Sequence, residues 1–150
     1  MESYARSGWT PILIDGPGVA QRYLVAARSL FNGLAVLARD GTNAEAAATF
    51  LAGQALEGAL KAHLASVGYS GSRLSHAPFG HNLEALWFEA ATHGLDLPAK
   101  PPEWCSKLND GHREDFSFHR SLGTGDGGAL DPVVLTAELA VVLTAVGKTV

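Results

Sequence analysis

The sequence contains very little cysteine, and its single thiol, Cys105, cannot form a disulfide within the chain. No Cys-x-x-Cys pair occurs, and the histidines from His76 onward lack the paired helical spacing that zinc sites use. The pattern therefore predicts no metal site, and no motif calls for a cofactor. A chain without disulfides fits a reducing compartment, so we expect a cytoplasmic protein.

An excess of positive charge and long apolar runs are also missing. Eleven basic side chains against 15 acidic ones give a net charge of −4, which excludes the overall charge of a strong nucleic-acid binder but leaves a local basic site open. The first residues hold no apolar run of signal-peptide length, and the apolar stretch near the C-terminus carries Glu138 and is too short to span a bilayer. We expect neither secretion nor membrane insertion.

Several common catalytic motifs are absent. The chain has no GxxxxGK[ST] loop, no GxSxG turn and no HExxH helix, so P-loop, serine-nucleophile and zinc-protease chemistry lack support. The glycine-rich string 123–128 fits GxGxxG, but a dinucleotide site needs a strand before it and a helix directly after it. No strand-like run precedes this string, and we assign it no function.

Hydrophobic residues make up 47% of the 150 residues and charged residues 17%, which fits one domain with a substantial core. The apolar residues recur at three- and four-residue spacing, and no alternating run predicts a strand. We expect an extended arm over residues 1–17 and a single all-α domain over 18–150, folded as an up-and-down bundle of four to five helices. The expected helices cover residues 17–39, 42–68, 83–93, 103–109 and 131–146, with loops at 69–80 and 111–130.

The second expected helix carries a line of polar residues. Gln54, Glu57 and Lys61 lie within about 80° of one another at 100° per residue. One interpretation is a solvated face with a Glu57–Lys61 ion pair four residues apart. The other is the rim of a cleft, where the carboxylate and the ammonium orient a ligand. The residues alone leave both interpretations open.

Arg113 and His119, separated by five residues, are the second candidate group. The planar guanidinium of arginine can hold a phosphate, and histidine can move a proton near neutral pH. Together these groups suffice for metal-independent cleavage of RNA, in which the 2′-hydroxyl attacks its own phosphate. The alternative is that both side chains simply belong to a polar loop.

Two segments together resemble a known family. The first segment has the pattern A-x-Q-x-x-E-x-x-L-K-A, which contains Ala52, Gln54, Glu57 and Lys61. The second segment is Gly80-His81-Asn82-Leu83-x-x-Leu86. In this order they are similar to the HEPN (higher eukaryotes and prokaryotes nucleotide-binding) domain. The resemblance implies a bundle of four or five helices that often dimerises, in a superfamily of toxin ribonucleases, antitoxin-paired proteins and members that only bind.

The resemblance also implies roles for residues. Active members carry R-x4-6-H, which Arg113 and His119 satisfy, so Arg113 would stabilise the phosphate and His119 would be the general base or acid. Gln54, Glu57 and Lys61 would line the cleft. We expect a metal-independent endoribonuclease of toxin type or a degenerate descendant of one. The alternative is a non-catalytic module that binds a nucleotide or a protein.

The expected partners follow from the same features. The last helix is apolar on two sides and the second has an alanine face, which is more apolar surface than a small monomer readily buries. We therefore expect a homodimer. RNA or a nucleotide is the expected ligand, and an antitoxin-type protein is a further partner that the resemblance implies.

Overall fold

The computed structural model describes residues 17–41, 44–115 and 130–150, and helices are the only regular elements in these ranges. They are α2 (Pro17–Asp40), α3 (Glu45–Ser66), α4 (Gly71–Leu74), α5 (Leu83–Thr92), α6 (Glu103–Asp115) and α8 (Pro132–Gly147). The expected all-α class is confirmed. No helix in the described part of the chain combines the length and apolar character needed to cross a membrane. The arm expected over residues 1–17 lies outside the described residues except for its last position.

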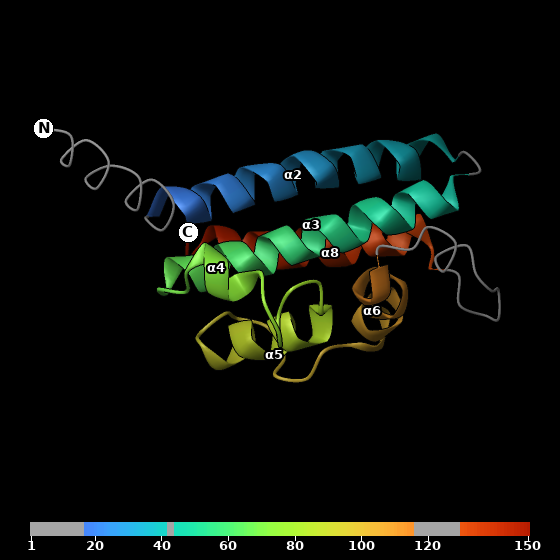
Figure 1. Ribbon diagram of the computed structural model, residues 1–150. Helices are drawn as coiled ribbons and strands as arrows, with labels where there is room; N and C mark the ends of the chain where they lie inside the picture. The colour runs from blue at the N-terminus through green and yellow to red at the C-terminus, as the bar shows by residue number, and fades with distance from the viewer. Residues whose placement is uncertain (1–16, 42–43, 116–129) are drawn as a thin grey trace, which may run out of the picture.

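The long helix α3 lies at the centre of the bundle. Helix α2 runs beside it along most of its length, and α8 packs against both α2 and α3. The shorter helices α5 and α6 lie on the side of α3 away from α2, and they also contact each other (Figure 1). As a result, other helices surround most of α3. A polar side chain on α3 can therefore be buried between helices.

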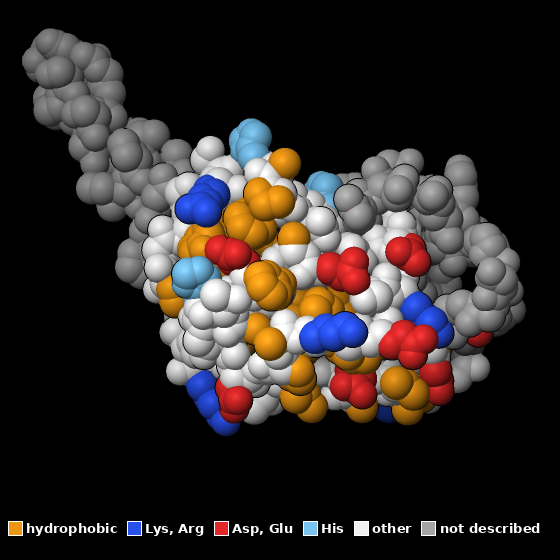
Figure 2. Space-filling model, turned by 90° about the horizontal axis from the view of Figure 1, so that it is seen from below, with side chains coloured by type: hydrophobic (Ala, Val, Ile, Leu, Met, Phe, Trp, Pro, Cys, Tyr) orange, Lys and Arg blue, Asp and Glu red, His pale blue; other side chains and the backbone are white. Residues whose placement is uncertain are grey.

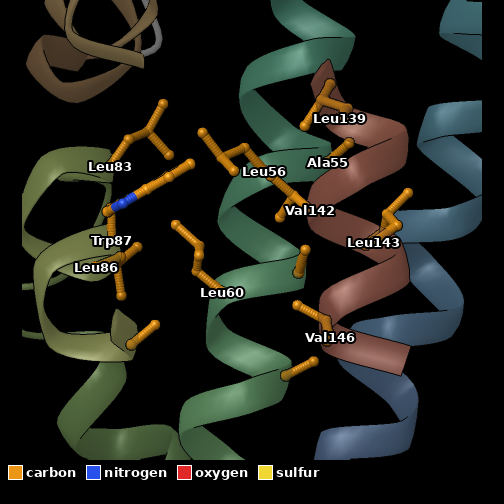
Figure 3. Close-up of a cluster of buried hydrophobic side chains, with 14 of the residues drawn as sticks. Ala55, Leu56, Leu60, Leu83, Leu86, Trp87, Leu139, Val142, Leu143 and Val146 are labelled. Carbon is orange, nitrogen blue, oxygen red and sulfur yellow. The ribbon is translucent and has the colours of Figure 1, made fainter. Parts of the chain in front are cut away.

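The side chains of α3 differ in size from one face to another. Five alanines on this helix are fully buried, Ala48, Ala52, Ala55, Ala59 and Ala62. Gly58 allows α2 to approach closely, because a Cβ there would lie 3.2 Å from the Cβ of Ala27 on α2. On the opposite side Leu56 and Leu60 point toward the apolar face of α5, which presents Leu83, Leu86 and Trp87 (Figure 3). Each buried leucine contributes about 1.5–3 kcal/mol through the hydrophobic effect.

Local hydrogen bonds and turn residues define several helix ends. The side chain of Asn82 accepts a hydrogen bond from the Ala85 amide, which caps α5. Asp131 accepts one from the Val133 amide, and Pro132 occupies the first turn of α8. Gly94 follows α5 with φ +96°, a conformation that favours glycine.

Two expected helix boundaries were wrong, and a third falls partly outside the described residues. The loop expected at 69–80 contains the short helix α4, and α6 continues to Asp115 through residues expected to form a loop. Helix α3 begins at Glu45, and Ala44 at its N-cap makes no side-chain cap bond. Thr42, the first residue of the helix expected over 42–68, lies outside the described residues. The extended part of α6 carries His112, whose contact with α3 is described below.

Candidate functional site

The polar line of α3 is partly enclosed by its neighbours. Lys61 Nζ donates to Glu57 Oε2 over 2.8 Å, and the side chains are only 7% and 12% exposed. The ion pair expected at this spacing is thus present, but the interpretation of Glu57 and Lys61 as a solvated face is wrong. Gln54, one turn before Glu57, is partly exposed. Burial of two opposite charges indicates a site or a structural network rather than a solubilising surface.

Helix α6 supplies a partner of Glu57 that lies as close as Lys61. The distance between His112 Nε2 and Glu57 Oε1 is 2.8 Å, and the imidazole is 4% exposed. Gly53 makes room for this ring, because a Cβ at that position would lie 2.6 Å from His112 Nδ1. A glycine inside a helix costs about 1 kcal/mol relative to alanine. The approach of His112 explains why this position in α3 is a glycine.

The loop before α5 supplies a second imidazole. His81 Nδ1 lies 3.1 Å from the same oxygen of Glu57, and its side chain is 44% exposed. The His81 and His112 rings meet edge to face with their centroids 6.0 Å apart. We call Glu57, Lys61, His81 and His112 the Glu57 cluster. It joins α3, α6 and the loop before α5, and His81 connects it to solvent.

The electrostatics of the cluster favour an ionised carboxylate. Burial acts to raise the pKa of Glu57, but hydrogen bonds with His112, Lys61 and His81 and the charge of Lys61 outweigh burial and lower the pKa to about 2. Burial and the negative charge of Glu57 raise the pKa of Tyr23 on α2. Glu57 therefore carries its charge throughout the physiological range.

A second group of hydrogen bonds fixes α6 against the start of α5. The side chain of Asn109 is buried, and its Oδ1 accepts from the Leu83 amide over 2.7 Å. Its amide nitrogen donates to Asn82 Oδ1 and to Glu84 Oε1. Asn109 is nearly one turn before His112, and Asn82 directly follows His81. These bonds hold the elements that carry the two imidazoles in register.

The arrangement combines groups of different chemistry within hydrogen-bond reach. A carboxylate and imidazoles can hold and transfer protons, and an ammonium can balance the charge of an anion. Imidazole nitrogens and carboxylate oxygens are also ligands for transition metals. One donor atom from each of Glu57, His81 and His112 can be chosen so that all three lie within 4.8 Å of one another.

The structure places some of the residues expected to act and does not describe others. Glu57 and Lys61 belong to the cluster, and Gln54 lies on the same helix. Arg113 is on α6 directly after His112, and the structure describes its backbone only. His119 lies outside the described residues, so the convergence of Arg113 and His119 stays a prediction.

The sequence pattern did not indicate His112, and it gave His81 no role. They follow Glu57 by 55 and 24 residues, so no local spacing connects them to it. The signal that could have indicated a close neighbour here is Gly53, a glycine inside a helix one turn before Glu57.

Comparison with known proteins gives no counterpart: no family model, curated protein or solved structure matches the chain. The resemblance to the HEPN family therefore rests on the two sequence segments that carry it.

Proposed function

We propose that the protein is a HEPN-like, metal-independent endoribonuclease in which Arg113 and His119 are the catalytic pair. The observation that carries the proposal is the contact between His112 and Glu57, because it holds α6 against the polar line of α3. Consecutive Cα atoms are about 3.8 Å apart, so the backbone of Arg113 lies close to the Glu57 cluster. A cationic residue thus follows a buried group of proton-carrying side chains.

The proposed reaction needs no metal. His119 removes the proton of the ribose 2′-hydroxyl, the oxygen attacks the adjacent phosphorus, and the bond to the 5′-oxygen breaks. The departing 5′-oxygen takes up a proton from solvent and His119 releases its proton to solvent, so the products are a 2′,3′-cyclic phosphate and a 5′-hydroxyl end. Arg113 stabilises the charge that develops on the phosphate oxygens. In this proposal Gln54, Glu57 and Lys61 line the cleft.

The charge distribution supports a short contact with RNA rather than a broad one. On the face formed by α5 and α6, the described acidic, basic and apolar side chains are interspersed, and Lys and Arg do not gather in one area (Figure 2). A net charge of −4 agrees with this picture. Binding would depend on a few groups near the cleft, and few counterions would be released.

The test is cleavage of a labelled single-stranded RNA by the purified full chain in the presence of EDTA. We expect cleavage to persist and to leave a 2′,3′-cyclic phosphate. His119→Ala should lower the rate by about 10²–10⁴, which is the usual contribution of one general acid–base group. Arg113→Ala should cost a comparable factor, and Arg113→Lys should restore little because the planar fork is lost.

Arg120→Ala is the matched control, because it removes a neighbouring positive charge and leaves the spaced pair in place. We expect only a small loss for this variant. Equal activity of the wild type and His119→Ala, or no activity in either, would contradict the nuclease proposal. The non-catalytic module that binds a nucleotide or a protein would then be the better interpretation.

We propose in addition that the protein is a homodimer and that an antitoxin-type protein controls it. Val134 and Val141 lie seven residues apart on one face of α8, and they are 48% and 60% exposed. Val133 beside them is 60% exposed. Exposed valines on one face of a helix fit an interface with a second copy. Co-purification with the product of a neighbouring gene would support the antitoxin part.

A further inference from the structure

We propose that Glu57, His81 and His112 form a binding site for one divalent transition-metal ion, with Zn²⁺ as the best match. The three residues come from α3, from the loop before α5 and from α6, so only the folded chain brings them together. Two imidazoles and one carboxylate are a donor set that zinc sites use, with the fourth position open to water.

Two of the three donor pairs are already near the spacing that a metal requires, and all three donor atoms lie within 4.8 Å of one another. Zinc–ligand distances of about 2.0–2.1 Å place two ligands of a tetrahedral ion about 3.3–3.4 Å apart. Glu57 Oε1 lies 3.1 Å from His81 Nδ1 and 2.8 Å from His112 Nε2. Both pairs need to separate by only a few tenths of an ångström, and the two nitrogens must each exchange a hydrogen bond to Oε1 for a bond to the metal.

The protonation states permit this exchange. A neutral imidazole carries one proton that can sit on either ring nitrogen. Metal bonds at His81 Nδ1 and at His112 Nε2 require the proton on the other nitrogen of each ring. For neutral rings the exchange is therefore a change of tautomer.

The groups around the three ligands orient them. Lys61 donates to Oε2 of Glu57, so the carboxylate presents Oε1 to the metal. The fit of His112 against Gly53 fixes that ring, and the hydrogen bond from Asn109 to Asn82 anchors the chain next to His81. The Lys61 charge lowers the affinity relative to an unpaired carboxylate. Mg²⁺, which prefers six oxygen ligands, is not expected to bind.

The test is a zinc titration of the untagged full chain, treated with EDTA and then dialysed, in competition with a chromophoric chelator. We expect one Zn²⁺ per chain for the wild type and no competition by Mg²⁺. His81→Ala should weaken binding by more than about tenfold, since even groups that only orient ligands contribute 10–100-fold. His81 is the best choice for substitution because its exposed side chain contributes little to the core.

His76→Ala is the matched control, because His76 is another exposed histidine in the segment between α3 and α5. It should bind zinc as the wild type does. A second readout is thermal unfolding, in which Zn²⁺ should raise the Tm of the wild type and of His76→Ala but not that of His81→Ala. Absence of stoichiometric binding, or wild-type affinity in His81→Ala, would overturn the proposal. No RNA is present, so the result is independent of the nuclease proposal.

Discussion

At the residue scale, Gly53 and His112 depend on each other. Glycine is a poor helix former, and a side chain at this position of α3 would collide with the His112 ring. The position is therefore selected by a contact with α6 and not by the requirements of α3 itself.

Gly53→Ala should destabilise the protein. Overpacking of this kind costs about 1–3 kcal/mol, which exceeds the gain of about 1 kcal/mol in helix propensity. Gly33→Ala on α2 is the control, because a Cβ there meets only Leu51 Cδ1 at 3.5 Å, an ordinary contact. We expect Gly33→Ala to stabilise the protein by up to about 1 kcal/mol in urea unfolding. Equal stabilisation by both changes would show that His112 does not pack on Gly53.

The ionised carboxylate of Glu57 makes stability depend on pH in the acid range. Hydrogen bonds and the charge of Lys61 lower the pKa of Glu57 from 4.5 to about 2 in spite of its burial. Below pH 4.5 the unfolded chain binds a proton at this residue that the folded chain does not. The free energy of unfolding should therefore fall as the pH is lowered from about 4.5 to about 2.

The measurement is urea unfolding at a series of acid pH values. Glu57→Gln should show a smaller fall over this range because it has no carboxyl to protonate. Glu103→Gln is the control, since Glu103 is 83% exposed and its pair with Lys107 spans 3.7 Å. Its curve should be parallel to that of the wild type. A wild-type slope in Glu57→Gln would contradict the assignment.

At the scale of the elements, α6 shows the limit of prediction from sequence. The starts of α5 and α8 were predictable because Asn82 and Asp131 cap them through local bonds. Residues 111–115 have few apolar side chains, so periodicity did not extend the helix to them. Their helical form accompanies the contact of His112 with Glu57, which is 55 residues away in sequence.

In the candidate site, too, local features were predictable from the sequence and tertiary contacts were not. The line of Gln54, Glu57 and Lys61 follows from helical spacing alone, and the ion pair within it is confirmed. The burial of this line depends on how α5 and α6 pack against α3. The same packing brings His81 and His112 next to Glu57. Spacing along one helix cannot supply this information.

Asn109→Ala should loosen the junction of α5 and α6. The change leaves the buried Leu83 amide without its acceptor, which costs about 1–3 kcal/mol. Hydrogen exchange should show faster exchange at the first turn of α5, with α2 and α8 unaffected. Ser72→Ala, at an exposed position of α4, is a control that should change neither the stability nor the exchange rates. Unchanged exchange in Asn109→Ala would show that these bonds do not secure α5.

At the scale of the whole molecule, the described surface has apolar side chains outside the core. Val133, Val134 and Val141 are exposed on α8, and Val25 and Val36 are exposed on α2. These exposed valines are apolar side chains of α2 and α8 that a second copy would cover in the proposed dimer.

Sedimentation equilibrium should therefore give twice the chain mass at micromolar concentration. Val141→Lys should shift the mass toward the monomer, since it places a charge in the proposed contact. Thr92→Lys is the control, because it adds the same charge at an exposed polar residue of α5, on the side of α3 away from α2. This variant should keep the wild-type mass. A monomer mass for the wild type would remove the dimer and any active site shared between copies.

The contact between Glu57 and His112 supports both proposals, because it places α6 against α3. A double-mutant cycle with Glu57→Ala, His112→Ala and the combined variant measures this contact through urea unfolding. Hydrogen bonds to charged groups contribute about 1.5–3 kcal/mol, and we predict a coupling free energy in this range. A coupling below about 0.5 kcal/mol, the usual error of additivity between independent sites, would contradict the account.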